Sequence, residues 1–234
     1  MSAAHFVGAV LPYITGVVFL LGIVYRINRW NKANAGKIPL FPSAAAPADK
    51  WKQILREVLI FRTLFDGNKP LWAGAWVFHV ALALILLGHV RVVTDFPLLW
   101  SRLGLNDARI DGISFIVGGA AGLILLGMGT YLLFRRFVVL RVREISNIED
   151  YVCLVLILAI VATGDFLRFG TAFDLNQTRE YFAGLLTFRA VAVPSNPCFL
   201  LHFFLGQVLI MYVPFSKFLH IPGVFYSKSL LYQQ

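Results

Sequence analysis

Five long apolar stretches constrain this chain more than any other feature of its sequence. A helix needs about 20 mostly apolar residues to cross roughly 30 Å of hydrocarbon, where backbone polar groups must be paired internally. The composition, 59% hydrophobic and only 14% charged, excludes an ordinary soluble domain, which carries about a quarter charged residues. We predict an all-α integral membrane protein, one domain over residues 1–234 built as a five-transmembrane-helix bundle. The expected spans cover residues 6–25, 71–93, 113–134, 151–169 and 198–220.

Basic residues are unevenly distributed among the segments that join these stretches. If the N-terminus faces outward, residues 26–70, 135–150 and the tail after 216 share one side and hold fifteen basic and six acidic residues. The other side is balanced, so the whole net charge of +9 falls on one face. Because basic loops stay in the cytoplasm, we predict a multi-pass protein of the cytoplasmic (inner) membrane, with its N-terminus outside and its C-terminus inside. Charges that flank spans in this way do not indicate nucleic-acid binding.

Residues 49–66 carry a helical pattern of a different kind. Apolar residues recur there at helical spacing against basic ones, and the apolar set is Trp51, Ile54, Leu55, Val58, Leu59 and Phe65. Such a pattern predicts an amphipathic helix that lies on the cytoplasmic side against membrane lipid headgroups. Docking of a cytoplasmic partner is the alternative.

Local signals also predict helix ends and a packing face. Ser146 and Glu149 have capping-box spacing before the fourth stretch, and Pro197 suits the first turn of the fifth. Gly118 and Gly122 place two small residues one turn apart, a spacing typical of close helix packing in membranes.

Four histidines lie inside just two of the stretches, His79 and His89 in the second and His202 and His220 in the fifth. An imidazole in hydrocarbon needs a partner, so an ionisable residue inside a span is a functional-site hypothesis. If successive spans alternate in direction, these two run antiparallel. We therefore expect His89 to face His202 near the outer surface, and His79 to face His220 near the inner surface. His5, alone at the outer margin, is expected to have no such role.

Two imidazoles on opposite helices can hold one haem iron through both axial positions, which favours electron transfer. Two such pairs predict two haem b groups stacked across the membrane. The two helices space their histidines differently. Ten residues (about 15 Å) separate His79 from His89, whereas eighteen (about 27 Å) separate His202 from His220, so the two inner histidines would not lie at the same depth in straight helices. Pro214 can bend the fifth helix. In an unbroken helix, five turns would place His202 and His220 on one face.

Two other classes of function remain open. A histidine-dependent metal transporter with a four-histidine zinc site needs all four rings around one ion, which the long separations disfavour. A haem-free membrane anchor for a soluble enzyme is the other alternative. A reduced-minus-oxidised absorbance spectrum separates both from a cytochrome.

Two motifs carry a resemblance to a known family. Phe78-His79 followed by Gly88-His89, and His202 followed by Pro214-Phe215-Ser216-Lys217 and then His220, resemble the haem-ligand helices of the gamma subunit of respiratory nitrate reductase and its NarI-like relatives. That family has five spans, an outward N-terminus and two b haems with the same ligand pairing. The short tail after His220 is more similar to the DsrM-type cytochrome b subunit of Dsr and Hme complexes of sulfur-metabolising microbes.

The resemblance implies the function, cofactors and partners of the chain. It implies an electron-transfer subunit of a quinone-linked oxidoreductase complex, of Dsr/Hme type or, alternatively, a quinol-oxidising subunit of nitrate reductase gamma type. The implied cofactors are two haem b, with menaquinone or another quinone as exchangeable substrate. The implied partners are a cytoplasmic iron-sulfur subunit, heterodisulfide-reductase-like or nitrate-reductase-like, and a periplasmic multihaem cytochrome c.

Site residues follow from the same motifs. The haem iron ligands are the four histidines, and no catalytic residue is expected. Gly88 matches the small residue that the family has beside the outer ligand, and Asp165 near the same face is a candidate to accept quinol protons, so both are assigned to a quinone site. Asp165 and Arg168, three residues apart, can also simply pair. Lys217 is a candidate contact for a haem propionate.

Overall fold

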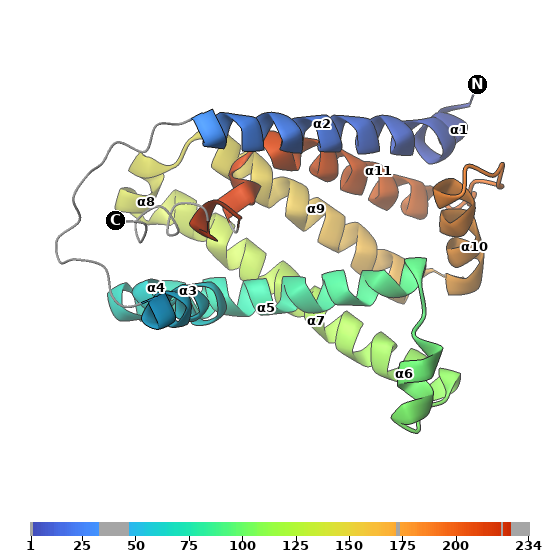
Figure 1. The fold of residues 1–234 in the computed structure, drawn as a ribbon, viewed down its shortest axis with the longest axis horizontal. Helices are drawn as coiled ribbons and strands as arrows, with labels where there is room; N and C mark the ends of the chain where they lie inside the picture. Colours follow the sequence, from blue (N-terminus) through green and yellow to red (C-terminus); the bar gives the residue numbers. More distant parts are fainter. Residues whose placement is uncertain (1, 33–46, 172–173, 221, 226–234) are drawn as a thin grey trace. The chain divides into compact units, whose positions relative to one another are not determined.

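The computed structural model describes residues 2–32, 47–171, 174–220 and 222–225, and every regular element in these ranges is a helix (Figure 1). Five helical segments of the described residues are long and apolar enough to cross a membrane. The predicted fold class is therefore confirmed. The segments are Ala3–Lys32, Lys69–Val93, Asp107–Val138, Ile148–Gly170 and Pro197–Phe215.

The first segment comprises α1 (Ala3–His5), a π-helical turn (Phe6–Val10) and α2 (Leu11–Lys32). The next three are single helices, α5 (Lys69–Val93), α7 (Asp107–Val138) and α9 (Ile148–Gly170). The fifth is α11 (Pro197–Tyr212), extended by a 3₁₀ turn, Val213–Phe215. The remaining helices are short, namely α3 (Pro47–Ile60), α4 (Arg62–Gly67), α6 (Pro97–Arg102), α8 (Leu140–Ile145), α10 (Leu175–Leu186) and a 3₁₀ turn at Lys217–Leu219.

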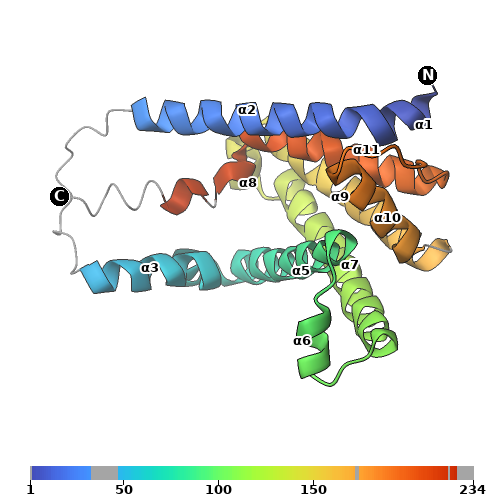
Figure 2. The ribbon, with the colours of Figure 1, turned by 45° about the vertical axis from the view of Figure 1, so that its right-hand side comes forward.

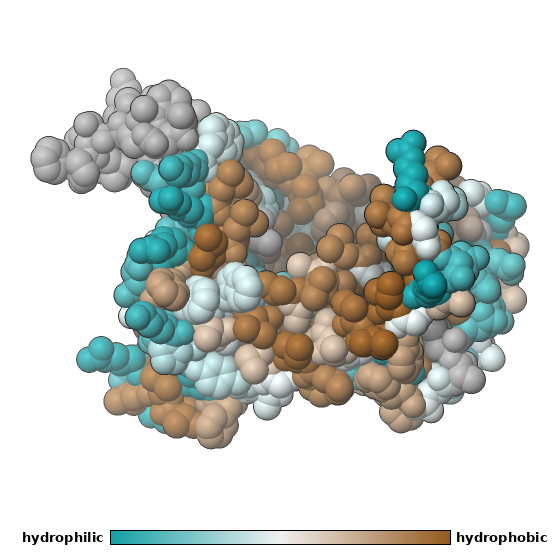
Figure 3. Space-filling view, turned by 90° about the horizontal axis from the view of Figure 1, so that it is seen from below, coloured by the Kyte–Doolittle hydropathy of each residue, from teal (hydrophilic) through white to brown (hydrophobic). Residues whose placement is uncertain are grey.

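The chain separates into two compact units. The first combines Met1–Tyr13 with Val77–Gln207, and the second combines Ile14–Trp76 with Val208–Gln234. Hydrophobic residues cover most of the face drawn in Figure 3, between hydrophilic margins. Large apolar side chains are exposed in both units: Leu21 in the second is 65% exposed and Leu87 in the first 67%. Because this surface would be costly in water, it suits contact with lipid tails.

Within the first unit, α7 and α9 pack closely through a face of small residues (Figures 1 and 2). A Cβ atom on Gly119 would lie 2.8 Å from Phe169 Cζ, and one on Gly129 would lie 2.9 Å from Leu158 Cδ2. Gly118 was predicted to lie on a packing face, and a Cβ atom on it would lie 2.8 Å from Arg168 Nη2. Only a residue without a side chain allows the two helices to approach this closely.

The helix α10, which the apolar pattern did not predict, lies across the ends of α9 and α11 (Figure 2). Its buried Tyr181 and Leu185 form a cluster with Leu167 of α9 and Phe199 of α11. The Tyr181 hydroxyl donates a hydrogen bond to the Gly8 carbonyl. Burial raises the pKa of this phenol well above its ordinary value, so the group stays neutral and continues to donate.

The amphipathic segment of the second unit is two helices rather than the one predicted. Phe61 has a positive φ of 54°, which ends α3 and starts α4. The indole Nε1 atoms of Trp72 and Trp76 donate to the carbonyls of Ile60 and Leu59 at 2.6 and 2.9 Å. These bonds satisfy carbonyls that the last turn of α3 leaves unpaired, and they tie α3 to the start of α5.

One predicted helix cap is correct and the other is misplaced by one residue. As expected, α11 begins at Pro197, and Asn196 Oδ1 accepts hydrogen bonds from the next two free backbone amides. The capping box of α9, however, consists of Asn147 and Asp150. Ser146 cannot serve as the cap because its hydroxyl donates to Val142 O and accepts from Arg136.

The fifth helix is shorter than predicted, and His202 and His220 do not share the face of one helix. The regular helix ends at Tyr212, and Ser216 is extended, with φ −113° and ψ 179°. Pro214 has no amide hydrogen and its ring clashes with the preceding turn, so the α-helix cannot continue through it. Pro214 packs against Gly22 of α2, where an added Cβ would lie 2.6 Å from Pro214 Cβ.

Candidate haem site

His89 near the end of α5 and His202 in the second turn of α11 come together in the first unit. Their ring centroids are 6.2 Å apart and their planes differ by only 20°. The His89 ring is exposed and the His202 ring is partly buried. The structure thus brings together the two rings that the antiparallel arrangement predicted as neighbours.

Each of these rings uses Nδ1 for a hydrogen bond to a backbone carbonyl. His89 Nδ1 lies 2.8 Å from Ile85 O, and His202 Nδ1 lies 3.0 Å from Ile160 O. A carbonyl oxygen can only accept, so Nδ1 must carry the hydrogen in both rings. In the neutral ring the lone pair is then on Nε2, which is the arrangement that metal-ligating histidines adopt.

The spacing of the two rings fits one iron between them. Bonds from a metal ion to imidazole nitrogen are about 2 Å long, so a centroid separation of 6.2 Å would leave room for one ion held by a nitrogen of each ring. There is also open space at the Cβ positions of Gly88, beside His89 in the sequence, and of Gly206. Gly206 follows His202 by one turn on the same face of α11. The donor atoms and this space fit a haem.

His79 belongs to the first unit and His220 to the second. The partly buried His79 ring meets the Phe78 ring edge-on, with centroids 5.3 Å apart. His220 follows the second 3₁₀ turn, is exposed, and has its Nδ1 3.0 Å from Lys217 O. The Lys217 carbonyl can only accept, so the His220 Nδ1 carries the hydrogen in this contact. Lys217 begins that turn and is exposed as well.

In the ranges that the structure describes, no three His, Cys, Asp or Glu side chains gather into a site for a metal ion. The four-histidine zinc hypothesis therefore gains no support from the structure.

Asp165 and Arg168 do not form the ion pair considered from their spacing. Arg168 Nη1 instead donates to Ser114 O and Phe115 O of α7, at 3.1 and 3.2 Å. Asp165 packs on Gly122, whose added Cβ would lie 2.9 Å from Asp165 Cγ, and its Oδ2 is buried with no hydrogen-bond partner. Gly88 has no atom of Asp165 within 4 Å of its Cβ position, so the two predicted quinone-site residues are not in contact.

A polar network beyond the end of α5 was not predicted as a unit. Asp95 accepts from Arg179 Nη2 at 2.5 Å, Trp100 Nε1 at 2.8 Å and Arg91 Nη2 at 3.3 Å. Partial burial opposes ionisation of Asp95, but hydrogen bonds from Trp100 and Arg91 and the two guanidinium charges outweigh it and lower the pKa of the carboxyl. The four-residue spacing of Arg91 and Asp95 was a visible signal, whereas Arg179 lies 84 residues from Asp95.

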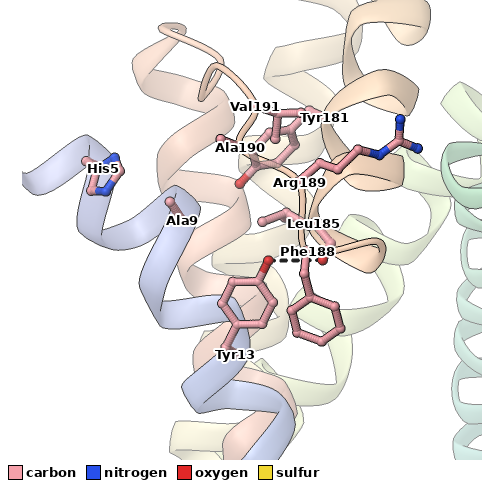
Figure 4. Close-up of a pocket in the computed structure, with 9 residues that line it drawn as sticks. All are labelled: His5, Ala9, Tyr13, Tyr181, Leu185, Phe188, Arg189, Ala190 and Val191. Atoms are coloured by element: carbon pink, nitrogen blue, oxygen red, sulfur yellow. Dashed lines mark hydrogen bonds between the residues drawn. The ribbon is translucent and has the colours of Figure 1, made fainter.

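A pocket of about 300 Å³ lies between the N-terminal helix and the segment after α10 (Figure 4). Tyr13 stacks on Phe188, with centroids 5.3 Å apart, and its hydroxyl donates to Leu185 O at 3.0 Å. His5 is at the rim (Figure 4). Both tyrosine hydroxyls of the pocket already donate to backbone carbonyls.

Comparison with known proteins places these residues in a family. The family model described as "Nitrate reductase gamma subunit" matches residues 63–232, a range that contains all four histidines. The chain belongs to the nitrate reductase gamma subunit family. The resemblance found in its two histidine motifs is thereby confirmed.

Individual relatives match over nearly the whole chain. The "Hdr-like menaquinol oxidoreductase cytochrome b-like subunit" of Archaeoglobus fulgidus is 30% identical, over 95% of this chain and 78% of the relative. The protein of the same name from Archaeoglobus profundus is 27% identical, over 98% and 79%. The nitrate reductase gamma chain of Bacillus subtilis is 25% identical, over 91% and 88%.

Proposed function

We propose that the chain is a membrane cytochrome b subunit that carries two haem b groups and moves electrons between a quinone pool and a partner redox subunit. The observation that carries this proposal is the pair of near-parallel imidazoles of His89 and His202, 6.2 Å apart. The Nδ1 atom of each ring makes a hydrogen bond to a backbone carbonyl, so Nε2 is the nitrogen that would bind the iron. A ligand pair that fills both axial positions suits electron transfer rather than substrate binding.

The residues of the chain would bind and orient the haems. Haem iron with two imidazole ligands accepts and releases one electron at a time. The Ile85 and Ile160 carbonyls hold His89 and His202 in one tautomer, so neither ring would need to exchange a proton before it binds iron. His79 and His220 are the proposed ligands of the second haem.

The remaining site residues keep supporting roles in the proposal. Lys217, three residues before His220, would contact a propionate of the inner haem. Gly88 leaves open space beside His89, and Asp165 has a buried carboxylate oxygen without a partner. We assign Gly88 to the approach of a quinone ring and Asp165 to proton uptake near it.

The proposed setting is the cytoplasmic membrane, with the N-terminus outside and the His89–His202 haem on the outer side. Identity of 30% to the menaquinol oxidoreductase subunit, against 25% to the nitrate reductase gamma chain, supports menaquinone as substrate. We further propose a heterodisulfide-reductase-like iron-sulfur partner in the cytoplasm, in a complex of Dsr/Hme type, and a periplasmic multihaem cytochrome c. A gamma-type subunit of a nitrate reductase is the alternative.

Absorbance spectra of the purified chain and its histidine variants test this function. We expect two low-spin b haems per chain in the reduced-minus-oxidised spectrum and in a quantitative haem assay. His89→Ala and His202→Ala should each remove the same haem, while His79→Ala and His220→Ala should each remove the other. His5→Ala is the matched control and should retain both.

Two outcomes would contradict the proposal. A folded preparation without haem would reject the cytochrome function altogether. Loss of different haems within one pair would reject the assigned pairing but leave the function standing.

A further inference from the structure

The helix α9 contributes no proposed haem ligand, yet it contacts the His202 ring at two successive residues. Thr163 Oγ1 lies 3.1 Å from His202 Nδ1. A Cβ on Gly164 would lie 3.0 Å from His202 Cε1. Together with the Ile160 carbonyl, these residues contact the His202 ring from α9. We propose that Thr163 positions His202 and lowers the reduction potential of the haem that His89 and His202 hold, an inference that rests on the proposed function.

The hydroxyl of Thr163 is oriented to accept from the histidine. It lies 2.9 Å from both Ala159 O and Ile160 O, and a carbonyl can only accept, so the hydroxyl hydrogen goes to one of them. The lone pairs of Oγ1 then remain for His202 Nδ1–H, which is shared between this oxygen and Ile160 O. The other tautomer would place a bare Nδ1 lone pair against the Ile160 carbonyl oxygen.

A second contact holds α11 against this part of α9. Cys198 Sγ lies 3.5 Å from the Thr163 carbonyl, one turn before His202. Gly164 removes the side chain that would otherwise push against the ring. The ring is therefore limited on one side by the Gly164 backbone and fixed in rotation by its Nδ1 bonds.

The two ligands of this haem differ in how they are held. His89 Nδ1 bonds to Ile85 O, a carbonyl of its own helix. His202 alone of the pair has a side-chain oxygen on its Nδ1, supplied by a different helix. A side-chain substitution can thus change the environment of one ligand and leave the other as it is.

A stronger hydrogen bond from Nδ1–H makes Nε2 a stronger electron donor, because the ring gains partial imidazolate character. A stronger donor stabilises the oxidised iron more than the reduced iron, so the reduction potential falls. Removing the Thr163 oxygen should therefore raise the potential of this haem and loosen the ring orientation.

The test is a redox titration of the purified, haem-loaded protein, monitored by absorbance and by electron paramagnetic resonance of the oxidised haems. Thr163→Val keeps the shape of the side chain but removes the acceptor, and Thr163→Ser keeps the acceptor. We expect the His89–His202 haem of Thr163→Val to titrate at a higher potential with altered g values. Thr163→Ser should match the wild type, and the second haem should not move in either variant.

An unchanged or lower potential in Thr163→Val, with both haems bound, would overturn the proposal. If Thr163→Val does not fold, the comparison of Thr163→Ala with Thr163→Ser makes the same distinction. A shift of similar size in Thr163→Ser would also overturn it, because the effect would then come from packing. Absence of haem from the wild type would instead reject the proposed function.

Discussion

At the scale of single residues, the backbone carbonyls around His89 and His202 decide which nitrogen each ring offers. An apolar helix gives an imidazole few partners, and both rings take a carbonyl. Because a carbonyl cannot donate, this choice leaves Nε2 free in both cases. The Nδ1 of His220 likewise lies 3.0 Å from a backbone carbonyl, that of Lys217.

Gly164→Ala tests how tightly the His202 ring is held. The new Cβ would lie 3.0 Å from His202 Cε1, closer than van der Waals contact allows, so the ring must move by a few tenths of an ångström. We expect both haems to be retained and the g values of the His89–His202 haem to change. Gly206→Ala in α11, where the Cβ position is open, is the comparison, and we expect it to reduce the content of the His89–His202 haem because the new methyl group would occupy space proposed for the haem.

At the scale of helices, α7 and α9 depend on glycines at particular positions. Gly122→Ala would bring a Cβ within 2.9 Å of Asp165 Cγ, and overpacking of this kind costs about 1–3 kcal/mol. We expect a lower thermal unfolding temperature of the detergent-solubilised protein. Gly127→Ala in the same helix is the control. No described atom lies within 4 Å of its Cβ, so it should be neutral or stabilising by about 0.5–1 kcal/mol. Equal effects would show that Gly122 has no special packing role.

The two indole hydrogen bonds between α5 and α3 provide a second test at this scale. Replacing both Trp72 and Trp76 by Phe keeps an aromatic ring but leaves the carbonyls of Ile60 and Leu59 without their donors. We expect faster amide hydrogen exchange in residues 55–61, because the end of α3 would open more often. Trp51→Phe is the matched control, since Trp51 is exposed on α3. Unchanged exchange in the double variant would mean that packing alone holds the two helices together.

At the scale of the whole molecule, the network around Asp95 joins helices that are distant in sequence. Arg179 of α10 contacts Asp95 through Nη2 and the Arg91 carbonyl through Nε, at 2.5 and 2.8 Å. Trp100 of α6 contacts the other carboxylate oxygen of Asp95. Two short helices and the end of α5 are thus held by one carboxylate, within the first unit of the chain.

The stability of this network should depend on pH. The pKa of Asp95 is lower in the folded protein than its ordinary value, so its contribution is complete above about pH 5 and is lost as the pH falls through the folded-state pKa. We expect Asp95→Asn to lower the unfolding temperature at pH 7, by an amount that corresponds to roughly 1 kcal/mol. The difference between variant and wild type should shrink towards pH 3. A difference that stays constant with pH would show that the carboxylate charge is not involved.

Part of the site could be predicted because it depends on local sequence and on helix direction alone. The spans follow from apolar length, and the approach of His89 to His202 follows from two antiparallel helices with histidines near the same end. The break at Pro214 was foreseen only as a bend, because its docking on Gly22 depends on a helix that is about 190 residues away in sequence. The bonds from Arg168 to backbone carbonyls of α7 could not be predicted from its three-residue spacing to Asp165, because they depend on the neighbouring helix.

The amino-acid sequence alone determined that the chain has five apolar stretches long enough to cross a membrane and that His79, His89 and His202 lie in them, because hydrophobic length is a property of each segment by itself. The tertiary structure decided which atoms each imidazole contacts. Thr163 is an ordinary helical threonine in the sequence, and it lies beside His202 only because of the rotation of α9 about its own axis. That rotation is set by packing against neighbouring helices, which no single segment encodes.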